Sequence, residues 1–193
     1  MTGDQYQEWT RLASGQALAL EPPQRRYGGA WGSLLAMESP TPTFTVRPIG
    51  TVHSPYTATR EIPKGLGAEH REEGTIEIFP ELEEGLQDIE GFSHLYVVWV
   101  FDRAGALPET WVGKPPADDR PHGVFATRSP RRPNPLALTV VELLGREGRI
   151  LTIRGVDMLD GTPVLDLKPY LSSVPAEKLR RGWLAEAEAR GKA

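Results

Sequence analysis

Short β-favouring segments joined by even shorter turns are the main feature of the second half of this chain. Two of the turns, 145–148 (Gly-Arg-Glu-Gly) and 160–163 (Asp-Gly-Thr-Pro), are typical of β-hairpins. Parallel strands need a crossover of about a dozen residues or more, so short connections favour antiparallel pairing. The expected strands are 44–52, 74–79, 95–101, 124–127, 136–144, 149–156 and 164–167. The sequence therefore predicts a mainly β fold, a single antiparallel barrel or strongly curled sheet.

The apolar run from Leu95 to Phe101 is rich in β-branched and aromatic residues. A continuous run of this length predicts a central strand that is buried on both faces. Two helices are also predicted, over 80–89, which opens with proline and carries acidic residues in its first turn, and over 175–190. The long Pro-rich stretch between 101 and 124 predicts a functional or mobile loop.

The chain divides by composition into three parts. Residues 1–42 lack lasting apolar periodicity, which predicts a disordered N-terminal extension. Residues 43–172 form the predicted barrel domain, and 173–193 form a C-terminal helical tail. Met37 offers an alternative start of translation, which would make the preceding residues an artefact of gene prediction, and the two interpretations stay equally open.

Composition excludes several classes of protein and site. The net charge is −4, so a globally basic nucleic-acid-binding surface is excluded, although a local basic patch is not. The absence of cysteine excludes disulfides, cysteine nucleophiles and thiolate metal sites. The 4 histidines have no clustered spacing, so no metal site is predicted. No apolar run reaches bilayer length and no signal peptide is recognised, which predicts a cytoplasmic protein without a membrane partner.

Residues 123–135 form the strongest local motif, Gly-Val-Phe-Ala-Thr-Arg-Ser-Pro-Arg-Arg-Pro-Asn-Pro. The prolines in its second half fix φ and remove backbone donors, which predicts a stiff loop. Such a loop holds its arginines and Asn134 in defined directions, which suits bidentate contact with phosphate or carboxylate. The alternative is a solvated basic loop that pairs with acidic neighbours.

Residues 157–163 also allow two interpretations. Asp160 followed by Gly161 is a turn signal, and a plain hairpin turn explains it. The functional alternative is a carboxylate and backbone amides at a strand end that hold ribose hydroxyls or an amino group. Lys168 is expected to lie half in the core and to pair with Asp166.

Two histidines, His53 and His94, lie at predicted strand ends and are candidates for acid–base chemistry. A hydrogen-bonded or strand-capping role is the simpler interpretation of each. The chain has no Gly-x-Gly-x-x-Gly or Walker loop, so the standard dinucleotide and nucleotide cradles are absent.

Four blocks of the sequence, 48–56, 91–95, 123–135 and 157–170, together resemble the TsaA-like domain of the TrmO family. They occur in the family's order, and the resemblance covers about 44–172. It implies a β-barrel fold and an S-adenosylmethionine-dependent tRNA methyltransferase that binds its cofactor as a homodimer. The implied reaction places a methyl group on N6 of threonylcarbamoyladenosine, just 3′ of the anticodon. The short C-terminal tail resembles a short form of the family, so the choice of substrate stays open.

The resemblance also implies the residues of the cofactor site. They are Pro63, Lys64, Asp102, Arg103, Arg128, Leu138, Asp157, Leu159, Asp160, Gly161 and Thr162. Leu138 is the implied apolar contact of the adenine. This chain departs from the family at Gly65, where other members carry a longer side chain, and at the Asp102–Arg103 pair, where others carry a His-Gln type of pair.

Methyl transfer from a sulfonium is an in-line displacement that depends mainly on positioning and needs no metal. The predicted catalytic residues are Asn134, which with the carbonyl of Pro133 or Pro135 would accept the N6 proton, and Arg131. The predicted substrate-binding residues are Arg120, Arg131 and Arg132. These arginines would clamp the threonyl carboxylate or the phosphates of the anticodon loop.

Three alternatives are weighed against this enzyme. A module with the same fold could bind S-adenosylmethionine or a nucleotide without methylating tRNA, or the methyl group could go to another substrate. An oligonucleotide-binding barrel would interleave aromatic and basic residues on its strands. Here the aromatics crowd 92–101 and the arginines lie in loops, which disfavours that last alternative.

Overall fold

The computed structural model describes residues 18–19, 44–63, 70–171, 175 and 181–191. The chain forms two units, 1–47 and 48–193. In the first unit, β1 (Leu18–Ala19) pairs antiparallel with β2 (Thr45–Val46). The rest of the predicted N-terminal extension, Met37 included, lies outside the described residues, as does Lys64.

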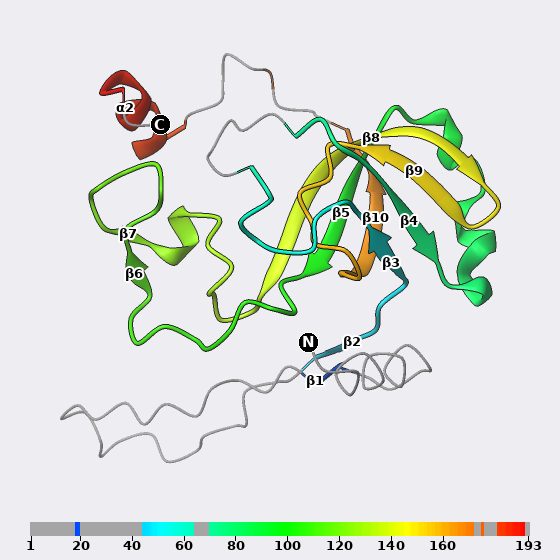
Figure 1. Ribbon diagram of the computed structural model, residues 1–193, viewed down its shortest axis with the longest axis horizontal. Coiled ribbons are helices and arrows are strands. Elements are labelled where there is room, and N and C mark those ends of the chain that lie inside the picture. Colours follow the sequence, from blue (N-terminus) through cyan, green and yellow to red (C-terminus); the bar gives the residue numbers. More distant parts are fainter. Residues whose placement is uncertain (1–17, 20–43, 64–69, 172–174, 176–180, 192–193) are drawn as a thin grey trace. The chain divides into compact units, whose positions relative to one another are not determined.

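The second unit is built on a closed barrel of six strands (Figure 1). The strand order around the barrel is β10-β3-β4-β9-β8-β5, and every neighbouring pair is antiparallel. The strands are β3 (Gly50–His53), β4 (Glu73–Ile78), β5 (His94–Val100), β8 (Leu136–Glu147), β9 (Ile150–Arg154) and β10 (Pro163–Pro169). The predicted mainly β fold with an antiparallel barrel is confirmed.

Alternating apolar residues fill the interior of the barrel. Ile76, Leu95, Val97, Leu151 and Ile153 are fully buried there and come from three different strands, β4, β5 and β9. Because side chains alternate between the two faces of a strand, the intervening residues point outward. The alternation therefore fixes which face of each strand meets the core.

The prediction that the strand at 95–101 is buried on both faces is wrong. Leu95, Val97 and Trp99 of β5 are buried, but Tyr96 and Val98 are only partly covered. A barrel has one filled interior, so a strand with neighbours on both edges still presents its other face outward.

Three other predicted elements differ in the structure. The expected helix at 80–89 is two 3-10 helices, η1 (Pro80–Leu86) and η2 (Ile89–Gly91), because Asp88 between them has a left-handed φ of 64°. The expected strand at 124–127 is the 3-10 turn η3 (Val124–Ala126). The helix predicted over 175–190 is described only as α2 (Trp183–Ala189), with 176–180 outside the described residues.

The Pro-rich stretch after β5 also contains a small hairpin that the sequence did not predict. Its strands are β6 (Val112–Gly113) and β7 (His122–Gly123), which pair antiparallel. Figure 1 shows this segment beside β5 and β8, on the side of the barrel away from β9. We call residues 101–135 together with α2 the lobe.

Two glycines are required by the barrel. A Cβ at Gly50 would collide with the carbonyl oxygen of Glu77 on the paired strand. Gly161, in the turn before β10, has a φ of +77°, which glycine adopts without strain. Among the residues that the structure describes, no helix has the length and apolar character needed to span a membrane.

Candidate functional site

The barrel has an open strand edge where β8 begins. In the described pairing, β9 pairs with β8 from Glu142 onward, whereas residues 136–141 of β8 pair with β5 alone. A strand that lacks one neighbour exposes an edge as well as its two faces. Leu138, Thr139 and Val140 can therefore all border the same cavity.

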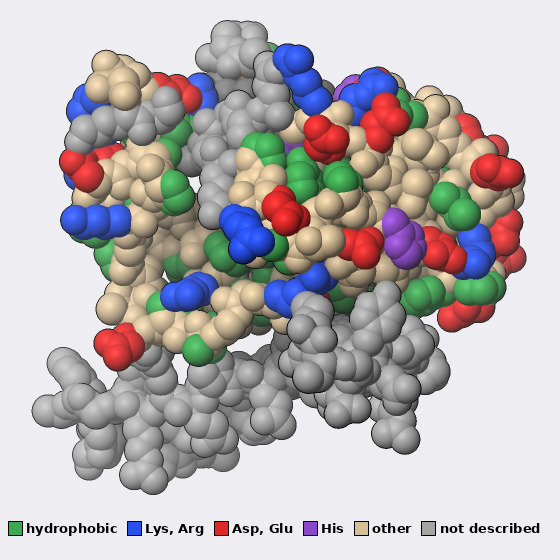
Figure 2. Space-filling model, viewed as in Figure 1, with side chains coloured by type: hydrophobic (Ala, Val, Ile, Leu, Met, Phe, Trp, Pro, Cys, Tyr) green, Lys and Arg blue, Asp and Glu red, His purple; other side chains and the backbone are tan. Residues whose placement is uncertain are grey.

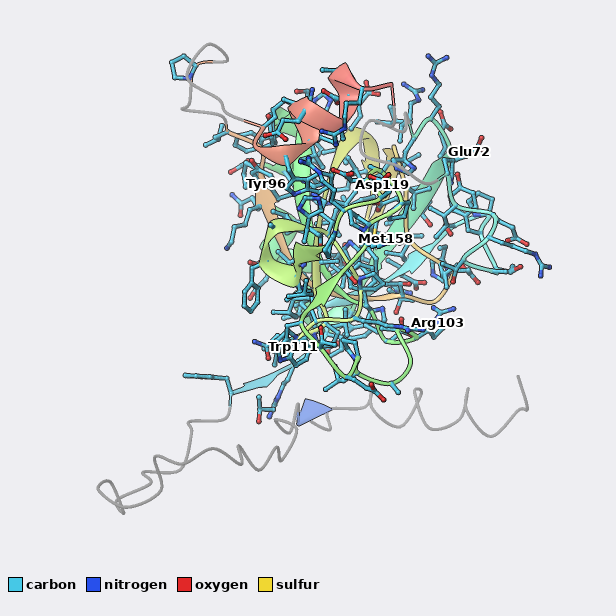
Figure 3. All side chains as sticks on the ribbon, turned by 90° about the vertical axis from the view of Figure 1, so that its left-hand side faces the viewer. Glu72, Tyr96, Arg103, Trp111, Asp119 and Met158 are labelled. Atoms are coloured by element: carbon cyan, nitrogen blue, oxygen red, sulfur yellow. The ribbon has the colours of Figure 1, made fainter. Side chains whose placement is uncertain are left out.

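This cavity has a volume of about 1100 Å³ and lies between the barrel and the lobe. The barrel side contributes Trp99 and Thr139, together with Asp157 and Leu159 from the segment that follows β9. Figure 3 views the lobe from its outer side, with Arg103 and Trp111 on the segment that follows β5. The lobe residues on the cavity wall include Asp102, Arg103, Trp111, His122, Arg128, Arg131 and Trp183.

A chain of hydrogen bonds orients Asp157 in the cavity wall. The indole N–H of Trp99 donates to Thr139 Oγ1 at 3.0 Å, and the Thr139 hydroxyl donates to Asp157 Oδ1 at 2.7 Å. Burial raises the pKa of the Asp157 carboxyl, while the Thr139 hydrogen bond and the charges of His70 and Arg128 oppose this shift. The result is a fixed acceptor at the junction of the barrel and the lobe.

His70 lies on the same wall and was not singled out from the sequence. Its Nδ1 is buried and has no hydrogen-bond partner, alone among the buried side-chain nitrogens and oxygens of the described residues. A buried polar atom without a partner is costly. This wall therefore offers a hydrogen-bonding position that the fold itself does not use.

Arg103 joins two of the predicted cofactor segments. Its guanidinium donates to Asp102 Oδ2 at 3.0 Å, to the carbonyl oxygen of Asp160 at 2.8 Å and to Thr162 Oγ1 at 3.4 Å. Burial raises the pKa of the Asp102 carboxyl above its ordinary value, although the adjacent Arg103 opposes this shift. Asp102, Arg103 and Thr162 border the cavity, so the pair after β5 and the turn before β10 meet there.

Asp160 and Gly161 do not line the cavity and instead fix the turn. Asp160 Oδ1 accepts a hydrogen bond from the Ser54 backbone N–H at 3.2 Å, and the Gly161 N–H donates to the carbonyl oxygen of Val52 at 2.8 Å. These two residues therefore form a turn, as the simpler interpretation predicted, but not a hairpin turn, because β9 before it and β10 after it are not neighbours in the barrel. Whether they also bind a cofactor stays a prediction.

His53, His94 and Lys168, the other polar residues considered from the sequence, contact neighbouring side chains of the barrel. His53 Nε2 lies 3.0 Å from Glu77 Oε2, and His94 Nδ1 lies 3.0 Å from Ser93 Oγ, as the simpler interpretation expected. Lys168 pairs with a carboxylate oxygen of Asp166 at 2.7 Å, but its side chain is 65% exposed. Its expected place half in the core is therefore wrong, because it lies on the outer side of β10 near the strand's end.

Only some residues of the arginine-rich loop line the cavity. Arg128 and Arg131 line the cavity, as do the predicted contacts Pro63, Leu138 and Leu159. Arg132 and Asn134 do not. The carbonyl oxygen of Pro135, one of the two proposed proton acceptors, is bonded to the Phe101 N–H at 2.8 Å.

Arg120 takes part in a cluster of charges that holds α2 against the rest of the lobe. Asp118, whose side chain is fully buried, accepts hydrogen bonds from Arg120 and from Arg190 at the end of α2, and lies 3.3 Å from His122 Nε2. Arg120 also bonds Glu186 of α2 at 3.0 Å. Burial by itself raises the pKa of Asp118, but the hydrogen bonds from Arg120 and His122 hold it well below its ordinary value.

Known proteins resemble this chain over the region that carries the cavity. The model of the tRNA-methyltransferase O N-terminal domain matches residues 51–176. The chain belongs to the TrmO family. A "Probable S-adenosyl-L-methionine-binding protein" of Pyrococcus abyssi is 49% identical over 142 residues, which are 72% of this chain and 74% of that protein.

Two further TrmO relatives are longer than this chain. The "tRNA (adenine(37)-N6)-methyltransferase" of Homo sapiens is 34% identical over 137 residues, 68% of this chain and 31% of that protein. The crystal structure of TrmO from Pseudomonas aeruginosa matches with a TM-score of 0.60 and 36% identity, covering 73% of this chain and 62% of that one. The chain therefore spans less than two thirds of these two proteins.

The TrmO resemblance left several cavity residues unnamed: His70, Trp99, Trp111, His122, Thr139 and Trp183. Thr139 carries a signal in the sequence, because it is a polar residue at a buried position in the otherwise apolar stretch 136–141. Trp183 lies within the helix predicted over 175–190. Within the described residues, no cluster of three or more His, Cys, Asp or Glu side chains could hold a metal ion.

Proposed function

We propose that this chain is an S-adenosylmethionine-dependent methyltransferase that acts on N6 of threonylcarbamoyladenosine next to the tRNA anticodon. One observation carries the proposal: in a chain of the TrmO family, the cavity gathers predicted cofactor residues from three separate segments, represented by Pro63, Arg103 and Asp157. The matching relatives named tRNA (adenine(37)-N6)-methyltransferases support the enzyme class. With a tRNA substrate, we also propose a cytoplasmic location.

The residues on the cavity wall fit the chemical groups of S-adenosylmethionine. Leu138 and Leu159 offer apolar surface for an adenine, and Thr162 and Asp157 offer acceptors for ribose hydroxyls or the amino group. The Asp157 carboxylate also complements a positively charged donor in a partly dehydrated site. Asp102 is already neutralised by Arg103, so Asp157 is the carboxylate better placed for this role.

When bound, S-adenosylmethionine supplies a methyl group on a positively charged sulfur. The chain's own contribution is to align the acceptor nitrogen with that methyl group and to exclude water. The N6 nitrogen loses a proton when it gains the methyl group, so an acceptor on the cavity wall assists the transfer. Asp157 is the acceptor that the geometry favours, because Thr139 fixes its orientation and burial makes it a stronger base. Asn134 remains the alternative, tested by the loss of turnover in Asn134→Ala.

The threonylcarbamoyl group brings a carboxylate, and the anticodon loop brings phosphates. Arg128 and Arg131 on the cavity wall are placed to bind such anions, with Arg132 beside them on the loop. Figure 2 shows acidic and basic side chains interspersed over the visible described surface, so a local arginine site fits better than a broad basic one. Arg120 would contribute only if its pairs with Asp118 and Glu186 opened.

We further propose that the enzyme is a homodimer. Leu136, Leu138 and Val140 form an apolar row on the outer face of β8, with side chains that are 38–51% exposed. Exposed apolar rows of this kind mark interaction surfaces. Leu138 and Val140 of this row also border the cavity, so a partner copy on it would lie close to the cofactor site. Val140→Glu is expected to give a monomer in multi-angle light scattering, and a wild-type monomer would contradict the dimer.

The test is transfer of labelled methyl groups from S-adenosylmethionine to tRNA. The full chain is incubated with tRNA from a strain that has threonylcarbamoyladenosine but lacks its N6-methyl group. Label is expected in the nucleoside adjacent to the anticodon, and Arg128→Ala is expected to lower the rate about tenfold or more. Lys168→Gln, which alters an exposed ion pair on the outside of the barrel, is the matched control and should keep the wild-type rate.

A second function is suggested by the names of several relatives. The Pyrococcus protein, two Archaeoglobus proteins and a Methanothermobacter protein are named for S-adenosyl-L-methionine binding and not for a reaction. A protein of this kind would bind S-adenosylhomocysteine in calorimetry but transfer no label to tRNA. The same two measurements therefore separate the enzyme from a binding module.

A further inference from the structure

The cavity has an aromatic wall that belongs to the lobe and not to the barrel. The rings of His122 and Trp183 stack with centroids 4.1 Å apart and planes inclined by 20°. The indole N–H of Trp183 donates to the carbonyl oxygen of Ala126 at 2.8 Å, which fixes the ring. Both rings line the cavity, and Trp111 lines it as well.

The helix that supplies Trp183 is too short to be stable alone. α2 has seven residues, and isolated helices shorter than about a dozen residues are marginal in water. It is held by the buried Asp118, which binds Arg190 just after α2, and by the bond from Arg120 to Glu186 of α2. The buried carboxylate of Asp118 therefore helps to hold Trp183 at the cavity wall.

The size of the cavity leaves room for a base beside a cofactor. Sites for a single drug-sized ligand have volumes of roughly 300–1000 Å³, and this cavity has about 1100 Å³. The predicted cofactor contacts Asp157, Leu159 and Thr162 lie on its barrel side. The aromatic wall lies on the lobe side, and Arg128 and Arg131 line the cavity from the lobe as well.

An RNA base is the occupant that suits this wall. Proteins that read single-stranded RNA splay bases out and stack them on Trp, His and other aromatic rings, while arginines bind the attached anions. We propose that the His122–Trp183 pair is the stacking platform for the purine that accepts the methyl group, so that the C-terminal helix completes the substrate half of the site. The inference rests on the proposed function and assigns the acceptor base to a place within that site.

The test is a double-mutant cycle between Trp183 and the base. Wild type and Trp183→Leu are titrated into two fluorescent anticodon stem-loop RNAs, one with threonylcarbamoyladenosine and one abasic at that position. Trp183→Leu is expected to weaken binding of the first RNA roughly tenfold and of the abasic RNA less than twofold. Trp183→Phe, which keeps an aromatic ring, is expected to restore most of the affinity.

Two controls isolate the role of the ring. Arg190→Gln keeps the Trp183 ring but removes one anchor of the helix that presents it, so it should weaken binding of the first RNA more than of the abasic RNA, by a smaller factor than Trp183→Leu. Calorimetry with S-adenosylhomocysteine should give the same affinity for wild type and Trp183→Leu. A weaker affinity for that ligand would assign the platform to the cofactor's adenine and overturn the inference.

Other outcomes also decide the matter. Equal weakening of both RNAs by Trp183→Leu, no weakening, or absence of RNA binding by the wild type would each overturn it. If wild type methylates tRNA and the cycle shows no coupling, this inference fails and the proposed function stands. If the cycle shows coupling but wild type transfers no methyl group, the base site stands and the proposed reaction fails.

Discussion

The barrel and the lobe are held together by different forces. The barrel joins six strands by antiparallel ladders around fully buried residues such as Ile76 and Ile153. The lobe has two-residue strands, a 3-10 turn and a short helix, joined through side-chain contacts that meet at Asp118. The comparison indicates a division of labour, in which the barrel supplies stability and the lobe supplies one wall of the site.

The largest expected effect is on the barrel core. Ile153→Ala should lower the free energy of unfolding by about 2–5 kcal/mol, because it removes apolar contacts and leaves a cavity. Ile150→Ala, on the same strand but 40% exposed, is the control and should cost less than about 1 kcal/mol. Urea denaturation measures both. Equal losses would contradict the view that the barrel interior carries the stability.

The next largest effect is local to the lobe. Asp118→Asn removes the charge that Arg120 and Arg190 share, so α2 should detach while the barrel stays folded. Hydrogen exchange is expected to rise at least tenfold in residues 183–190 and to stay unchanged in the barrel strands. Asp166→Asn, at an exposed pair on β10, should alter neither region.

The same carboxyl predicts how docking of α2 depends on pH. The folded state lowers the pKa of Asp118, so its contribution is fully present above the ordinary value, near 4, and is lost only as pH falls through the lower folded pKa. We therefore expect wild-type α2 to exchange at the same protected level at pH 5 as at pH 7, after correction for intrinsic rates. Loss of protection between these values would contradict the assignment of Asp118 as the anchor.

Asp157 should have opposite effects on stability and activity. Because burial raises its folded pKa, the native state binds more protons than the unfolded state between the ordinary and the raised value, and stability falls as pH rises through that interval. Asp157→Asn is expected to melt at a higher temperature than wild type at pH 7 but to transfer methyl groups about tenfold or more slowly. Unchanged transfer would remove Asp157 from the site.

The smallest expected effect is at the outer side of the barrel. His53→Gln breaks the pair with Glu77, in which both side chains are substantially exposed, and should change the free energy of unfolding by less than about 0.5 kcal/mol. Urea denaturation is again the measurement. A loss comparable with that of Ile153→Ala would show that polar contacts hold the barrel as they hold the lobe.

The strands could be predicted because their evidence is local. Alternation and hairpin turns occupy neighbouring residues, so the strands at 74–79, 136–144 and 149–156 were found close to their true ends. Val124 to Thr127 has the same β-favouring composition, yet the β6–β7 pairing ends at Gly123 and the chain turns into a 3-10 turn, closed by the Thr127 N–H, which donates to the carbonyl oxygen of Val124 at 3.1 Å. A local pattern does not show where the pairing with another strand ends.

The candidate site was predicted unevenly for a similar reason. Motif resemblance named Arg128, Leu138 and Asp157, which the fold brings to one cavity. It could not separate Asp157 from Asp160 and Gly161, which belong to the same short motif as Asp157 but make their hydrogen bonds within the turn. In a short turn, neighbouring residues point in different directions, and only the tertiary structure shows which of them reach a shared cavity.

The sequence by itself determined the antiparallel barrel, its family and the segments that carry polar chemistry, because these depend on periodicity, turn residues and order along the chain. Tertiary structure decided the contacts between residues far apart in sequence. Thr139 meets Asp157 and Trp99 because β9 leaves the edge of β8, and Trp183 meets His122 because a buried Asp118 attracts two arginines. Such contacts depend on chain closure and burial, which no local pattern of residues records.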